Sequence, residues 1–282
     1  MSSRAREQKK RQMSQVIAFL QSTFLFAAVS ISVFYFGFLA PETIKTNLSD
    51  SNYYVGMANL IIEGAEDLLI PTGLPASILE GVIDRSNVHQ EVRAFLDGEF
   101  SGEPHVINVE TMNRQLKENI ATYLGDREVA PEAIDEIVDA LTNHYINLIE
   151  FPFLSQIVRI VRIFEWVMKV FVAGGLLLTL LSGLFISRMN RWKHRTYRYW
   201  SYGVGGCGLM LWVGPALLKW YAPYERLAIR PEFVYNFLVL HIERGLGLMV
   251  LSGQILTGVA ALLALISLNK VNKLKKSAKK KS

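Results

Sequence analysis

Seven ionisable side chains of this sequence lie beside long apolar stretches, and their chemistry suits proton transfer or phosphate binding. Four precede the apolar segment that begins at Val170 and three precede the one that begins at Gly245; they are Arg159, Arg162, Glu165, Lys169, His241, Glu243 and Arg244. Histidine and glutamate act as general acids and bases, and arginine binds phosphate or carboxylate groups with two hydrogen bonds. Charges at the edge of a membrane indicate a functional site or an ion pair, because an unpaired charge there is costly.

The first four of these residues form one stripe. Arg159, Arg162, Glu165 and Lys169 are spaced three or four residues apart, so they share one face of an α-helix whose other positions are mostly apolar. The stripe is typical of an interfacial helix whose basic groups meet lipid headgroups. Alternatively, it lines a polar cavity or docks on the acidic segment 41–158. For Glu243 we expect an ion pair with Lys169 or Arg162. No spacing among the seven is diagnostic of a reaction, so we expect no catalytic residue, cofactor or metal.

The elements that must position these residues are four apolar stretches, each about as long as the 20 residues needed to cross the hydrocarbon core. The predicted spans are 16–39, 159–187 with its amphipathic approach, 199–218 and 245–268. Around them lie a basic N-terminus, an acidic segment, a basic loop, an outer loop and a lysine-rich tail, at 1–15, 41–158, 188–198, 219–244 and 269–282. The sequence therefore predicts an all-α, polytopic membrane protein with four transmembrane helices and a helical extracytoplasmic domain between the first and second.

Basic residues indicate the orientation of the spans. Five Lys and Arg residues precede the first span, five lie within 188–198, and seven lie in the tail from Lys270. Because basic flanks stay in the cytoplasm, both termini are predicted to be cytoplasmic and 41–158 extracytoplasmic. We expect the basic ends to meet anionic lipid headgroups at the cytoplasmic face or, alternatively, an acidic cytoplasmic partner.

The net charge of the chain is the sum of an acidic segment and a basic remainder. Residues 41–158 contain six basic and 20 acidic residues, which gives −14, whereas the whole chain has +5. The basic pI therefore does not indicate nucleic-acid binding. The one cysteine, Cys207, falls in the third span, so no disulfide stabilises the acidic segment. A single acceptor-like Asn-Leu-Ser at Asn47 and the lack of disulfides favour the cytoplasmic membrane of a bacterium.

The acidic segment predicts a bundle of four or five helices. After a polar connector from Pro41, apolar residues recur with helical spacing in 51–70, 76–84, 87–97, 110–124 and 131–149. Its carboxylates gather at 63–67 and 132–139, which we interpret as solvated helix faces.

Small residues in the third and fourth spans indicate closely approaching helices. Glycines crowd 203–214, and Gly253, Thr257 and Ala261 follow one another every four residues. Rows of this kind let backbones come into contact, within one bundle or between copies of a homo-oligomer.

Three functions remain open at this point. We favour a non-enzymatic accessory or assembly protein of the bacterial cell envelope that binds partner proteins through its outer domain. The second is a membrane subunit of a transport system, since an outer domain between spans one and two, with both ends inside, resembles in layout the cell-division-type ABC permease subunits. That resemblance implies an ATPase partner. Without one, an oligomer would be needed, because four spans alone enclose little room for a transport pathway. The third is a lipid- or wall-acting enzyme that uses His241 and Glu243, although the sequence has none of the usual hydrolase, zinc-protease or phosphate-loop motifs.

Overall fold

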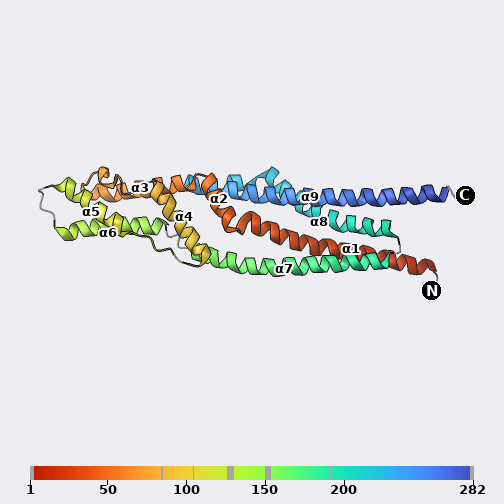
Figure 1. Cartoon of the computed structure of the whole chain (residues 1–282). Helices are drawn as coiled ribbons and strands as arrows, with labels where there is room; N and C mark the ends of the chain where they lie inside the picture. Colours follow the sequence, from red (N-terminus) through yellow and green to blue (C-terminus); the bar gives the residue numbers. More distant parts are fainter. Residues whose placement is uncertain are drawn as a thin grey trace. The chain divides into compact units, whose positions relative to one another are not determined.

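The computed structural model describes residues 3–83, 85–103, 105–125, 130–149, 154–190 and 192–279. All regular elements in these ranges are helices (Figure 1). The chain forms two compact units. The span unit consists of Met1–Ala40, Ile163–Leu227 and His241–Ser282, and the helical unit consists of Pro41–Arg162 and Ala228–Leu240. Arg191, Lys280 and Lys281, which were counted among the basic residues, lie outside the described ranges.

Four long helices supply the span unit. They are α1 (Ser3–Phe34), which continues as the π-helix η1 (Tyr35–Leu39), and α7 (Leu154–Met189), α8 (Lys193–Tyr221) and α9 (Glu232–Lys279). The stretches Gln8–Leu39, Val158–Met189, Lys193–Arg226 and Glu232–Lys273 are long and apolar enough to cross a membrane. The predicted set of four membrane-crossing helices is therefore confirmed in length and composition. Residues 233–240 lie within the outer loop predicted at 219–244 and are helical, so they extend the fourth helix, which the sequence also allowed.

Glycines bring the helices of the span unit into backbone contact. A β-carbon added at Gly208 of α8 would lie 2.7 Å from the amide nitrogen of Thr257 and 2.9 Å from the carbonyl oxygen of Gly253, both on α9. A β-carbon at Gly253 would in turn lie 2.5 Å from the amide nitrogen of Trp212. The predicted small-residue row of the fourth span thus packs against the third span of the same chain.

Side-chain hydroxyls reinforce these contacts. Ser201 donates to the carbonyl of Ala260 at 2.8 Å, and Ser267 donates to the carbonyl of His194 at 2.7 Å, so two hydrogen bonds join α8 and α9. On α1, which packs along α8, the fully buried Gln21 lies against Gly203, whose missing side chain makes room for it. The hydrogen bonds of Ser201 and Ser267 provide the internal partners that polar atoms need where they face no water, whereas the carboxamide of Gln21 has no such partner among the described residues.

The helical unit is built from five α-helices, two short 3₁₀ turns and the first residues of α7 and α9. The helices are α2 (Pro41–Asp50), α3 (Tyr53–Leu69), α4 (Arg85–Ser101), α5 (Glu110–Leu124) and α6 (Pro131–Ile149), and the turns are η2 (Ile70–Thr72) and η3 (Ala76–Leu79). The predicted helices at 110–124 and 131–149 match α5 and α6. Two expectations differ from the structure. The expected polar connector after Pro41 is helix α2, since proline is favoured in the first helical turn, and the expected helix at 76–84 is only the turn η3.

Helix α3 lies at the centre of the helical unit. It packs against α4 and α6, and α6 also packs against α5 (Figure 1). Ile61 of α3, Leu116 of α5 and Leu141 of α6 are at most 1% exposed. Phe233 and Phe237 of α9 complete this core, with their rings 5.1 and 5.9 Å from that of Tyr53. The helical unit therefore has a hydrophobic core of its own, as expected of a domain.

Gly208 and Gly214 of α8 provide a matched test of the α8–α9 contact. We expect Gly208→Ala to destabilise the span unit by about 1–3 kcal/mol, because the new methyl group would meet backbone atoms of α9, which cannot move aside. Gly214→Ala meets no atom within 4 Å and should leave the stability unchanged or slightly raised. Unfolding of both variants by titration with SDS, followed by circular dichroism, measures the difference. Equal stabilities would contradict the close approach.

Candidate functional site

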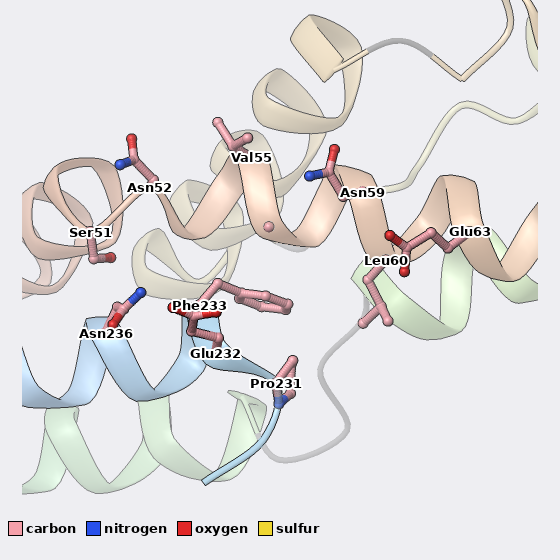
Figure 2. A pocket seen from close by; sticks show the side chains of 11 residues that line it. Ser51, Asn52, Val55, Asn59, Leu60, Glu63, Pro231, Glu232, Phe233 and Asn236 are labelled. Carbon is pink, nitrogen blue, oxygen red and sulfur yellow. The ribbon is translucent and has the colours of Figure 1, made fainter.

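A groove of about 530 Å³ lies in the helical unit between α3 and the start of α9. Figure 2 shows Leu60 and Phe233 between the two helices, and Asn236 of α9 pointing toward α3. Eleven residues line the groove: Ser51, Asn52, Val55, Gly56, Asn59, Leu60, Glu63, Pro231, Glu232, Phe233 and Asn236. The volume falls within the range of about 300–1,000 Å³ that is usual for ligand sites.

Two local features of the backbone shape this groove. Asn52 has φ of 58° in the turn between α2 and α3, a left-handed conformation that asparagine tolerates better than most residues. Gly56 lies where α3 meets α9, and a β-carbon there would be only 2.3 Å from Cγ of Phe233. The missing side chain of Gly56 therefore allows the phenyl ring to lie against α3 and form one wall.

The walls combine hydrogen-bonding and apolar groups. On α3, Val55, Asn59 and Glu63 are four residues apart and share one face. Three carboxamides, those of Asn52, Asn59 and Asn236, each offer donors and acceptors. Glu63 and Glu232 add two carboxylates, and no Lys or Arg side chain is among the eleven lining residues. The groove therefore favours a neutral or positively charged ligand with hydrogen-bonding groups on both sides.

Two buried tyrosine side chains lie at the start of α3. The rings of Tyr53 and Tyr54 are 6% and 5% exposed. Burial raises the pKa of both phenols above the usual value, since ionisation would place a charge where little water reaches it. Tyr54 stacks on the imidazole of His89 with ring centroids 4.2 Å apart. Tyr53 and Tyr54 therefore remain uncharged at neutral pH.

The stripe predicted from the sequence lies on α7. Glu165 and Lys169 pair with each other at 2.6 Å. Arg162 reaches Gly102 in the helical unit, where its Nη2 would lie 3.2 Å from an added β-carbon, and Arg159 is exposed. Arg159 and Arg162 belong to the helical unit, and Glu165 and Lys169 belong to the span unit.

The remaining three predicted residues lie early in α9. Nε2 of His241 lies 3.0 Å from the carbonyl oxygen of Phe38 and, as its donor, must carry the imidazole proton. That carbonyl belongs to the π-helix η1, next to the break between α1 and α2. Glu243 pairs with Lys219 at 3.4 Å rather than with Lys169 or Arg162, and Arg244 is exposed on the same helix. The partner of Glu243 is thus different from the one expected.

Apart from Glu63, which belongs to the carboxylate cluster at 63–67, the groove residues were not singled out in the sequence. Asn52 and Asn59 are separated from Asn236 by more than the whole length of the acidic segment, and no short motif joins them. A usable signal was present just before and within α3, where Asn52, Asn59 and Glu63 interrupt a mostly apolar segment. Comparison with family models, curated proteins and solved structures finds no match to this chain. The function must therefore be argued from the geometry.

His241 and Glu243 make contacts of different strength, which a pair of variants can separate. We expect His241→Ala to cost about 1–3 kcal/mol of stability, because the carbonyl of Phe38 loses a partly buried donor. Glu243→Gln removes an ion pair whose two side chains are 35% and 53% exposed, and should cost less than about 1 kcal/mol. Thermal unfolding in one detergent compares the two. A larger loss for Glu243→Gln would show that the ion pair, and not the histidine, stabilises this region.

Proposed function

We propose that this chain is a non-enzymatic accessory protein of a bacterial cell envelope, and that its helical unit binds a segment of a partner protein. In this proposal four spans anchor the chain in the cytoplasmic membrane, both termini are cytoplasmic, and the helical unit is extracytoplasmic. The orientation is supported by the basic residues at the N-terminus, between the second and third spans, and in the tail.

The groove between α3 and α9 is the observation that carries the proposal. A polypeptide main chain presents N–H and C=O groups at short intervals, and the carboxamides of Asn52, Asn59 and Asn236 can pair with both kinds. The apolar groups between them, Val55, Leu60 and Phe233, can receive side chains of the same segment. This alternation matches a peptide better than a compact apolar ligand, which would leave the carboxamides unpaired.

Charge supports a basic segment as the occupant. Glu63 and Glu232 lie on opposite walls of the groove, and residues 41–158 have a net charge of −14. Lysine or arginine side chains of a partner would form charge-assisted hydrogen bonds with these two carboxylates. The acidic surroundings would also speed the encounter with a basic partner.

A photo-crosslinking experiment tests this proposal in living cells. A photoreactive amino acid at Val55, which lines the groove and is 47% exposed, should capture a protein at defined stoichiometry. The same amino acid at Ile70, which is 73% exposed and outside the groove, is the matched control and should not capture that protein. Mass spectrometry of the adduct identifies both the partner and the crosslinked segment.

Charge reversal in the same experiment tests the electrostatic part. Glu63→Lys combined with Glu232→Lys should lower the yield of the Val55 adduct about tenfold, which corresponds to about 1.4 kcal/mol. Glu66→Lys combined with Glu136→Lys makes the same change in net charge at exposed positions away from the groove and should leave the yield nearly unchanged. Equal losses in the two double variants, or no adduct at all from Val55, would refute a basic partner segment in this groove.

A further inference from the structure

A second cavity of the helical unit is separate from the groove and is lined mainly by polar groups. Its volume is about 270 Å³, and it is bounded by α4, α5, α6 and the segment that leads into α5. Four carboxamides line it, those of Asn87, Gln90, Asn108 and Gln115. No residue of this cavity lines the groove between α3 and α9.

Tyr145 contributes a hydroxyl group to the lining of this cavity. Its side chain is 6% exposed. Burial, and to a smaller extent the nearby carboxylate of Glu91, raises the pKa of this phenol to about 12. As a neutral phenol, Tyr145 can donate a hydrogen bond to a bound molecule and accept one from it.

The charges of the cavity point to a neutral ligand. Glu91 is the one carboxylate among the lining residues, and its Oε2 lies 2.9 Å from Nε2 of His105, so it already has a hydrogen-bonding partner. No lysine or arginine lines the cavity, so nothing there would neutralise a phosphate or a carboxylate. An anionic ligand would therefore lose its hydration without a compensating charge.

The remaining groups match a molecule with several hydroxyls on a ring. Carboxamides and the hydroxyls of Thr111 and Tyr145 all donate as well as accept, which is what adjacent hydroxyl groups require. Val82, Ile107 and Met112 are buried and form an apolar surface inside the cavity. A sugar ring has both properties, with hydroxyls at its edge and C–H groups on its faces.

We propose that this cavity is a saccharide-binding site of the helical unit. The proposal stands apart from the partner-binding groove, since it uses other residues and another class of ligand. In the bound state the hydroxyls of Thr111 and Tyr145 and the surrounding carboxamides hold the ring hydroxyls, and the apolar surface receives a C–H face.

Calorimetry on the full chain in lipid nanodiscs tests the saccharide site. The probes are glucose, galactose and N-acetylglucosamine, each as the free sugar and as a β-linked tetramer, so that the two forms distinguish a free sugar from the unit of a polymer. At least one probe should bind with a millimolar or lower dissociation constant. Failure of every probe to bind at millimolar concentration would overturn the proposal.

Two conservative variants locate the binding in this cavity. Thr111→Val and Tyr145→Phe each remove one hydroxyl while keeping the shape of the side chain, and each should weaken binding about five- to tenfold. Thr122→Val, on the same helix but outside the cavity, is the matched control and should change the affinity less than twofold. Circular dichroism and thermal unfolding establish whether each variant is folded. If one of the variants Thr111→Val and Tyr145→Phe does not fold, the other is enough for the test. Binding that is unaffected by a folded Thr111→Val or Tyr145→Phe variant would place the sugar elsewhere and overturn the site.

Glu91→Gln separates a neutral ligand from a cationic one. The carboxamide keeps the size of the side chain and removes its charge, so a neutral sugar should lose less than about tenfold in affinity. The amine glucosamine serves as the cationic probe. Binding of glucosamine alone, abolished by Glu91→Gln, would replace the proposed saccharide site by a cation site.

Discussion

The packing of the start of α9 onto α3 is the interaction on which the helical unit depends. Phe233 and Phe237 lie beside Tyr53, and Gly56 has no side chain in the place that the phenyl ring of Phe233 occupies. These aromatic contacts join segments that are about 180 residues apart in the chain. They complete the core, and they also form one wall of the groove. The stability of the helical unit and the shape of the groove therefore both depend on Phe233. They also depend on the absence of a side chain at Gly56.

The span unit faces a different constraint, because polar atoms inside the hydrocarbon need partners within the protein. Ser201 and Ser267 donate to carbonyl groups of the neighbouring helix, and His241 lies within hydrogen-bonding distance of a carbonyl of η1. Backbone contact at Gly208 and Gly253 brings α8 and α9 close enough for the two serine bonds to form. Small residues thus allow α8 and α9 to approach each other closely, and the serine hydroxyls form hydrogen bonds between the two helices.

Much of the fold could be predicted because hydrophobic periodicity and span length are local properties. The four long apolar helices, α5 and α6 all follow from residue spacing. The groove could not be predicted, since it needs residues 51–63 and 231–236 to meet, and that depends on tertiary packing. The partner of Glu243 was missed for a related reason. Lys219 lies near the end of α8, and only the return of the chain into α9 brings it within 3.4 Å of that carboxylate.

The membrane orientation is the claim on which the proposed function depends most directly, because a groove in the cytoplasm would meet a different set of partners. It can be measured with single cysteines placed in a chain whose own buried cysteine has been replaced by Cys207→Ala. A membrane-impermeant thiol reagent applied to intact spheroplasts should label Ile70→Cys, at a position of the helical unit that is 73% exposed. It should label Ser277→Cys, in the lysine-rich tail, only after the membrane has been permeabilised. Labelling of Ser277→Cys in intact spheroplasts, with Ile70→Cys protected until permeabilisation, would contradict the account.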